Sequence, residues 1–350
     1  MCRATITLAA AAAMAMSGFS GSAAASDGYR ISGPVVHENL AIYLVHGASA
    51  PGPVPLTLQE ALANGSVRVN ETGNVNELEV ENRGAAEVFI QSGEIVKGGR
   101  QDRALTASLI LPPHSGKVPL ASFCVEQGRW SARGGEDSRQ FTTAASAVPS
   151  RAAKIAMKAP TVAEPNAPPT ADVGSRQSEV WKNVTAIQHK LARGVGAPVA
   201  APQSASSLQL SLENEKLKDR QAAYVQALQV AGEVDGVVGY VFAVNGKLNS
   251  ADIYPSNGLF RKMWPKLLAA NATEAIGETG MAAEPALPST EQVLAFLDHA
   301  EHGKAQEKAL NSTVRLETRE ADQSLYFETR RAPNAPGAAG GWVHRSYLAK

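Results

Sequence analysis

Short apolar segments separated by turn residues occupy the chain from 66 to 125. Val67, Val69, Leu78 and Val80 alternate with polar neighbours, which is typical of strands with one buried face. The residues Asn82-Arg83-Gly84 and Pro112-Pro113-His114-Ser115-Gly116 provide turns between such segments. Five short strands joined by tight turns predict an antiparallel sheet or sandwich rather than alternating βαβ units. We expect these strands at 66–71, 77–81, 87–91, 104–111 and 117–125.

Helical patterns follow in the second half of the chain. Apolar residues recur at helical spacing over 177–193, 210–230 and 256–270. Ser289 and Gln292 have the spacing of a capping box, which predicts a helix up to about residue 299. Asn245-Gly246 between two apolar runs predicts a hairpin, because both residues tolerate positive φ. The predicted fold class is therefore α+β, with an antiparallel, sandwich-like β-rich core and several packed helices.

Residues 1–25 have the pattern of a secretory signal peptide. Arg3 precedes an Ala-rich apolar run that ends in Ala23-Ala24-Ala25, so we expect cleavage after about Ala25 and an extracytoplasmic location, periplasmic or secreted. The alternative is an uncleaved anchor, but the apolar run is short for a span of about 20 residues. No later stretch is long and apolar enough to cross a membrane, so no span is expected after signal removal.

The rest of the chain is expected to form one α+β domain over 33–271, with the segment 272–350 packed on it as a helix and short strands. An Ala-, Ser- and Pro-rich excursion at about 141–174 interrupts this domain. It has few large apolar side chains with which to build a core, so the sequence predicts a flexible loop there.

Charge and cysteine content exclude several kinds of partner and site. The formal net charge is zero, so no basic field favours nucleic acid. Signal cleavage removes Cys2 and leaves Cys124 without an intramolecular disulfide partner. A lone cysteine in an apolar segment is more often buried core than nucleophile. The oligomeric state stays open at this level.

Polar side chains gather in the run from Ser92 to Trp130, at glycine turns and strand ends. Such positions often carry binding or catalytic groups. Glu94 and Glu126 are candidate catalytic residues, because paired carboxylates can act as general acid and base. Alternatively they pair with Arg103 and Arg129, respectively. The candidate ligand-binding residues are Arg100, Gln101, Arg103, Cys124, Arg129 and Trp130.

Known cofactor motifs are absent from this run. Gly98-Gly99 lacks the Lys-Ser/Thr ending of a phosphate loop, and the chain has no nucleophile elbow. Asp298, His299 and His302 lie close together near a helix end, but no third convincing ligand accompanies the two histidines. The sequence therefore predicts neither a metal site nor a cofactor.

Several blocks together resemble the ARG and rhodanese-phosphatase-superfamily-associated protein domain, a family of unknown function. They are Ser92-Gly93-Glu94, Gly98-Gly99-Arg100-Gln101-Asp102-Arg103, Cys124-Val125-Glu126-Gln127-Gly128-Arg129-Trp130, Gln177-Ser178-Glu179-Val180-Trp181 and Val244-Asn245-Gly246-Lys247. The likeness covers about 35–271 and extends to Val343-His344-Arg345-Ser346. The family name implies association with ADP-ribosylglycohydrolase-like and rhodanese-phosphatase proteins, and hence nucleotide or ADP-ribose chemistry.

Three hypotheses about function follow. In the first, the protein binds a small anionic ligand through Arg100, Arg103 and Arg129, because three arginines exceed two glutamates and leave a guanidinium for phosphate or carboxylate. Asp102 offers a third acid, which weakens this count. In the second, Glu94 and Glu126 form the active site of a hydrolase, which requires a common cleft. In the third, the protein is a non-catalytic envelope interaction protein, so the sequence leaves open whether it is an enzyme.

Overall fold

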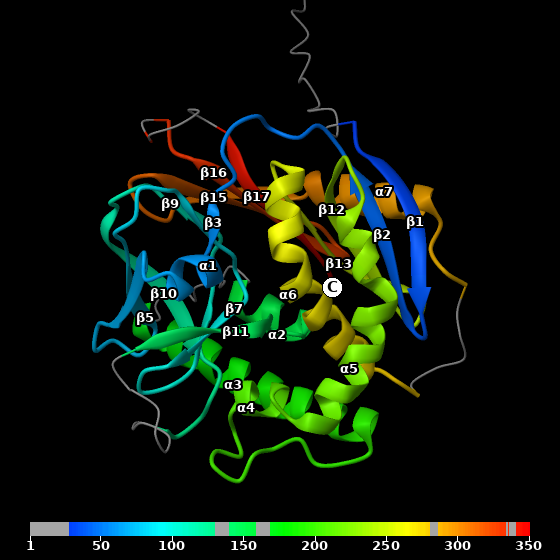
Figure 1. Ribbon diagram of the computed structural model, residues 1–350, viewed down its shortest axis with the longest axis horizontal. Coiled ribbons are helices and arrows are strands. Elements are labelled where there is room, and N and C mark those ends of the chain that lie inside the picture. Colours follow the sequence, from blue (N-terminus) through cyan, green and yellow to red (C-terminus); the bar gives the residue numbers. More distant parts are fainter. Residues whose placement is uncertain (1–27, 130–139, 159–168, 281–285, 334, 336–340) are drawn as a thin grey trace, which may run out of the picture.

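A computed structural model describes residues 28–129, 140–158, 169–280, 286–333, 335 and 341–350. The α+β class with a β-rich core is confirmed (Figure 1). The strands are β1 (Arg30–His37), β2 (Leu40–His46), β3 (Leu56–Thr57), β4 (Val67–Glu71), β5 (Glu77–Asn82), β6 (Val88–Ile90), β7 (Glu94–Gly98), β8 (Arg103–Leu105), β9 (Leu109–Leu111), β10 (Gly116–Cys124), β11 (Phe141–Ala147), β12 (Val237–Val244), β13 (Lys247–Ile253), β14 (Lys304–Ala309), β15 (Val314–Glu320), β16 (Ser324–Arg331) and β17 (Trp342–Ala349). The helices are α1 (Leu58–Ala63), α2 (Arg151–Lys158), α3 (Pro169–Val195), α4 (Leu208–Leu212), α5 (Glu215–Leu228), the 3-10 turn η1 (Gln229–Glu233), α6 (Asn257–Gly277) and α7 (Thr290–Glu301).

An antiparallel sheet in the order β1-β2-β12-β13-β17-β16-β15-β14 forms the larger layer. The predicted Asn245-Gly246 hairpin is confirmed, since it joins β12 to β13 with φ of 51° and 73°. The last strand, β17, lies between β13 and β16. The C-terminal segment is therefore part of the centre of this sheet.

Two smaller sheets contain the predicted strand series. One has the order β11-β7-β8-β10-β5-β4 and the other β3-β6-β9. The segment 104–111, expected as one strand, is divided between β8 and β9. The amide and hydroxyl of Thr106 still donate to the carbonyl of Ala121 on β10, and residues 106–108 separate the two strands. The two strands then pair in different sheets, β8 with β7 and β10, and β9 with β6.

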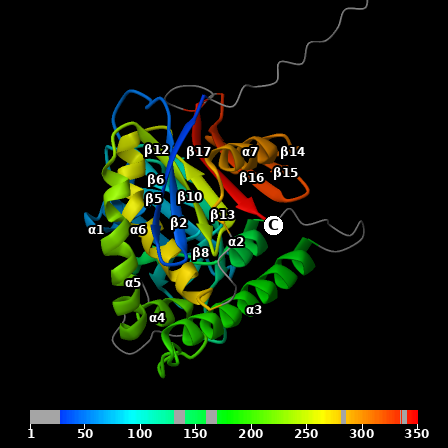
Figure 2. The same ribbon diagram turned by 90° about the vertical axis from the view of Figure 1, so that its right-hand side faces the viewer.

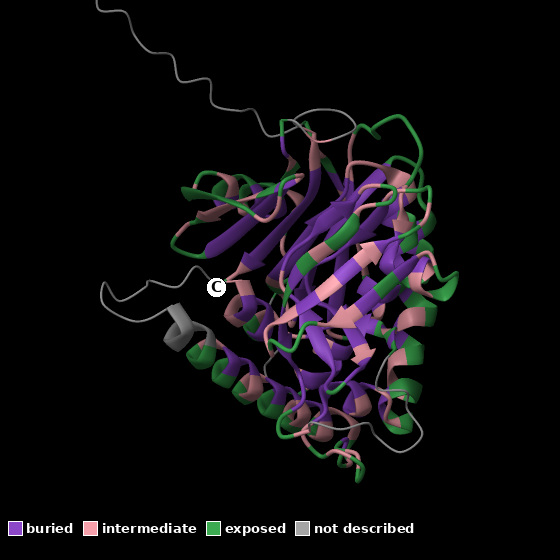
Figure 3. Cartoon of the chain, turned by 90° about the vertical axis from the view of Figure 1, so that its left-hand side faces the viewer, coloured by how far each residue is buried: buried purple, intermediate pink, exposed green. Residues whose placement is uncertain are grey.

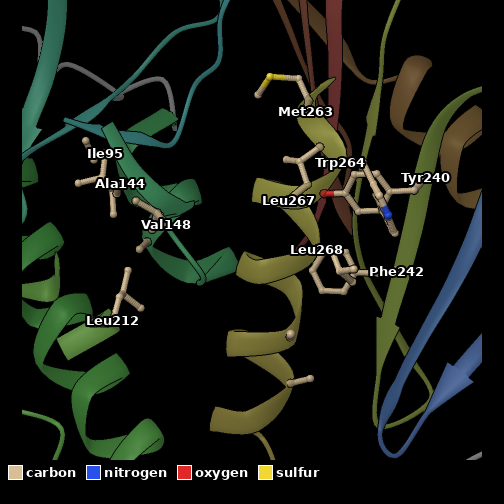
Figure 4. Close-up of a cluster of buried hydrophobic side chains, with 14 of the residues drawn as sticks. Ile95, Ala144, Val148, Leu212, Tyr240, Phe242, Met263, Trp264, Leu267 and Leu268 are labelled. Atoms are coloured by element: carbon tan, nitrogen blue, oxygen red, sulfur yellow. The ribbon is translucent and has the colours of Figure 1, made fainter. Parts of the chain in front are cut away.

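Helix α6 packs between the larger sheet and β11 (Figure 1). Ser256 caps its first turn by accepting from the Leu259 amide. Figure 4 shows Trp264 and Leu268 of α6 beside Tyr240 and Phe242 of β12, with Ala144 and Val148 on the opposite side of the helix. Each fully buried side chain of this size contributes about 1.5–3 kcal/mol to stability. This packing fixes α6 as the central helix.

Helix α7 covers the opposite face of the larger sheet (Figure 2). Side chains of β2 alternate between the two faces of the sheet. Leu40, Ile42 and Leu44 pack in the hydrophobic cluster that contains α6. Ala41, Tyr43 and Val45 pack in the cluster that contains α7. Both faces of the central strands are therefore buried (Figure 3). Within the described part of the chain, none of the helices has the length and apolar character needed to span a membrane.

The segment 141–158 differs from the flexible loop that its composition suggested. It forms strand β11, which pairs with β7, and helix α2, which packs on α3. Ala144, Ala147 and Ala153 are buried, because small side chains allow close backbone approach to neighbouring elements. Residues 1–27, which include the predicted signal peptide, the Pro-rich residues 159–168 and Trp130 lie outside the described residues.

Candidate functional site

The two blocks that carry most of the predicted site residues lie side by side in the six-stranded sheet. Arg103 of β8 is opposite Cys124 of β10 on one side and Val96 of β7 on the other. The β7–β8 turn contains Gly98 and Gly99, both with positive φ, which brings Asp102 back to accept from the Gly98 amide at 3.0 Å. The motif residues therefore meet at the end of these three strands.

Five buried or part-buried side chains at this strand end form what we call the arginine cluster: Glu71, Asp102, Arg103, Glu126 and Arg129. The predicted pair is present, with Arg129 Nε 2.6 Å from Glu126 Oε2. Arg129 Nη2 also lies 3.6 Å from Asp102 Oδ1, and Arg103 Nη2 lies 3.6 Å from Glu71 Oε2. Two guanidinium groups thus face three carboxylates, so the cluster has no surplus positive charge for an anion.

The other predicted ligand-binding residues beside the cluster do not converge on one space. Arg100 is exposed, and its backbone amide donates to Glu71 Oε1. Gln101 is fully buried, and its Nε2 has no hydrogen-bond partner among the described residues. Its backbone carbonyl accepts from Arg103 Nη1 at 3.0 Å. Gln101 is therefore a buried residue that helps to hold the Arg103 guanidinium in place.

Cys124 has a structural position. Its backbone amide donates to Gln177 Oε1 and its carbonyl accepts from Gln177 Nε2, both at 2.9 Å, so the side chain of Gln177 ties α3 to the end of β10. Burial raises the pKa of the Cys124 thiol to about 11. The thiolate form, which is the nucleophile and metal ligand, is therefore disfavoured at neutral pH.

Glu94 does not pair with Arg103, contrary to one of the two expectations. Its Oε1 accepts from Lys266 Nζ of α6 at 2.7 Å, and its Oε2 accepts from the Gln91 amide at 2.8 Å. The register explains this, because Arg103 is opposite Val96 rather than Glu94. Helix α6 places Lys266 against Glu94, and both side chains are almost fully buried.

The two candidate catalytic carboxylates point into different surroundings. Gly93, next to Glu94, donates to the Leu105 carbonyl, whereas Val125, next to Glu126, donates to that of Asp102. The two acceptors, Leu105 and Asp102, are three residues apart, which corresponds to about 10 Å of extended chain. Glu94 and Glu126 are therefore attached at different levels of the sheet. Glu94 faces α6 and Glu126 faces Arg129. This arrangement gives no support to a hydrolase in which both carboxylates face one cleft.

A second buried polar group, which sequence reasoning missed, lies on the larger sheet. His344 Nε2 is 3.2 Å from Asp252 Oδ1, and His344 Nδ1 is 3.0 Å from Ser108 Oγ. Tyr240 donates to Asp252 Oδ2 at 3.0 Å. Burial lowers the pKa of His344 against the opposing effect of Asp252. Burial opposes ionisation of Asp252, but the hydrogen bond and charge of His344 outweigh it and lower the Asp252 pKa.

A pocket of about 530 Å³ opens between β10 and the β14–β15 hairpin, and we call it the β10–β14 pocket. Three cationic side chains line it, Lys158, Arg176 and Lys308, against one carboxylate, Glu307. Its apolar lining comes from Leu109, Leu120, Phe123, Met157, Leu310 and Leu316. A hollow of about 700 Å³ near residues 197–216 instead carries Glu213 and Glu215 with Lys216. Of these two spaces, the β10–β14 pocket therefore has the greater excess of positive charge.

Lys158 stands between this pocket and Asp252. Across the larger sheet, Asp252 is opposite Ser346, Ser346 is opposite Phe327, and Phe327 is opposite Thr318, which lines the pocket. Lys158 Nζ donates to Ser346 Oγ at 3.1 Å and lies 4.6 Å from the centre of the Phe327 ring. Lys158 thus lines the pocket, and Ser346 and Phe327 of the larger sheet hold its amine.

Among the described residues, no three His, Cys, Asp or Glu side chains converge to hold a metal ion. His302 Nδ1 contacts Asp298 Oδ1 at 3.6 Å near the end of α7, with both side chains more than half exposed. No cofactor site is indicated by the described side chains at either buried cluster.

Comparison with known proteins gives one kind of match. Residues 28–348 match the model of the ARG and Rhodanese-Phosphatase-superfamily-associated Protein domain. No curated protein and no solved structure matches the chain. The match covers almost the whole chain outside the N-terminal segment.

Proposed function

The chain belongs to the ARG and rhodanese-phosphatase-superfamily-associated protein domain family, and on this premise we propose that it binds a small anionic ligand in the β10–β14 pocket. The observation that carries the proposal is the excess of cationic over anionic side chains in a pocket of about 530 Å³. Ligand sites commonly occupy about 300–1,000 Å³. A nucleotide or ADP-ribose is of suitable size and charge, and the family name supports that class.

Arg176 is the residue that we propose to hold the anionic group. Its guanidinium donates to the Met157 carbonyl and lies 5.2 Å from the centre of the Phe123 ring. These contacts fix a planar group that can bind phosphate or carboxylate through two parallel hydrogen bonds. The apolar lining suits the less polar part of such a ligand. Arg100, Arg103 and Arg129 have no part in this proposal, because the last two face carboxylates in the arginine cluster.

Replacement of Arg176 should weaken ligand binding strongly. We expect Arg176→Gln to reduce affinity for ADP-ribose or AMP by about 10- to 100-fold, because a hydrogen bond to a charged group contributes about 1.5–3 kcal/mol. Titration calorimetry would measure this, with the melting temperature recorded to show that the variant is folded. Arg100→Gln is the matched control, since Arg100 is exposed and does not line the pocket. Equal loss in both variants, or loss only in Arg100→Gln, would contradict the proposed pocket.

We further propose that the protein acts outside the cytoplasm. The support is the N-terminal pattern of Arg3, an apolar Ala-rich run and Ala23-Ala24-Ala25. When the full chain is expressed in a bacterium with a periplasm, the exported protein should begin at about Ser26. N-terminal sequencing of the periplasmic fraction would test this, and an intact Met1 in a membrane fraction would instead indicate an anchor.

A further inference from the structure

Lys158 differs in its surroundings from Lys308, the other lysine of the β10–β14 pocket. It is half-buried at the end of α2, with its amine bonded to a neutral hydroxyl and placed over an aromatic ring. Among the described residues, no carboxylate forms an ion pair with Lys158 within 4 Å. Lys308, by contrast, is exposed on β14. Lys158 is therefore a shielded amine that faces a ligand-sized space.

The carboxylate of the larger sheet whose charge acts on Lys158, Asp252, already has other partners. Asp252 accepts from Tyr240 and contacts His344 on its two oxygens. Burial lowers the pKa of Lys158 to about 8, helped by the charge of Lys154 one turn earlier and opposed by Asp252. At pH 7 about one molecule in ten then carries the neutral amine. Neutral amines are the nucleophilic form of lysine.

We propose that Lys158 forms a Schiff base with the carbonyl group of an anionic ligand whose charged group is held by Arg176. This proposal rests on the proposed function, since it names the ligand class of the same pocket as an anionic aldehyde or ketone. ADP-ribose belongs to this class, because its terminal ribose opens to an aldehyde.

The reaction needs no oxidant or reductant. The lone pair of Lys158 Nζ attacks the carbonyl carbon, the π electrons move to the carbonyl oxygen, and a proton passes from nitrogen to that oxygen to give a carbinolamine. Loss of the hydroxyl group with one further proton releases water and forms the C=N bond. Ser346 Oγ, 3.1 Å from Nζ, is placed to exchange a proton with the amine in these steps.

Reductive trapping tests the inference on the intact protein. The probe is pyridoxal 5′-phosphate at equimolar concentration, used as an aldehyde that carries a phosphate, followed by borohydride and peptide mapping. We expect labelling at Lys158 to exceed that at Lys308 by at least about tenfold, and to rise with pH to a half-maximal rate near pH 8. Lys158→Arg should abolish this label and retain the charge, Lys308→Arg should leave it unchanged, and Arg176→Gln should reduce it.

The outcomes separate the two proposals. If Lys158 stays unlabelled while AMP still binds the pocket in an Arg176-dependent way, the Schiff base is refuted and the binding function stands. If the label spreads equally over exposed lysines and is unaffected by AMP, the inference is also refuted. If AMP and ADP-ribose fail to bind at all, the proposed function itself is overturned.

Discussion

Lys266→Met should lower the free energy of unfolding by about 3–5 kcal/mol, because it leaves the carboxylate of Glu94 buried without its cation. Glu94 has no exposed surface and Lys266 is 5% exposed. Among the described residues, only the Gln91 amide still donates a hydrogen bond to Glu94 once the 2.7 Å contact is lost. Urea unfolding followed by circular dichroism would measure the change, and the midpoint should fall with little change in slope.

Two further variants show whether an unpaired charge is the cause. Glu94→Gln in the Lys266→Met background should recover much of the loss, since it removes the buried charge and keeps an acceptor for the Gln91 amide. Lys262 lies one turn earlier on α6 and forms a half-exposed ion pair with Glu60 at 3.0 Å. We expect Lys262→Met to lower the free energy of unfolding by only about 0–1 kcal/mol. Similar costs for the Lys262 and Lys266 variants would show that burial does not set the energy of this pair.

Gly98→Ala is the second variant with a large expected effect, a loss of about 3 kcal/mol or more. Gly98 has φ +124°, and a Cβ atom there would lie 2.3 Å from the backbone oxygen of Gln140. The β7–β11 pairing would have to shift, and with it the amide of Gly98 that donates to Asp102 of the arginine cluster. Thermal and urea unfolding would measure the loss.

Gly65→Ala is the matched control for that variant. Gly65 also has positive φ, at +75°, but a Cβ atom there would meet no other atom within 4 Å. We expect about 1 kcal/mol from the backbone conformation alone. A Gly98→Ala cost no greater than that of Gly65→Ala would mean that the backbone clash is relieved at little energetic cost.

Local chemistry made much of the fold predictable. The Asn245-Gly246 hairpin and the Ser289–Gln292 capping box are present because each depends on residues within four positions of one another. The Glu126–Arg129 pair could be predicted for the same reason, since the two residues are three apart. Composition misled at 141–158, where small residues were interpreted as a loop although they pack closely in β11 and α2.

The site depended on contacts between distant parts of the chain. The sequence by itself determined the α+β class, the antiparallel strands of the β-rich third and the turns between them, because period, turn residues and short loops act over a few residues. Only the tertiary structure placed Lys266 against Glu94 across 172 positions, joined Ser108 to His344 across 236, and brought Lys158 and Arg176 into one pocket with Lys308. Those partners are chosen by how helices and sheets pack, and packing depends on shape and burial across the whole chain rather than on any local pattern.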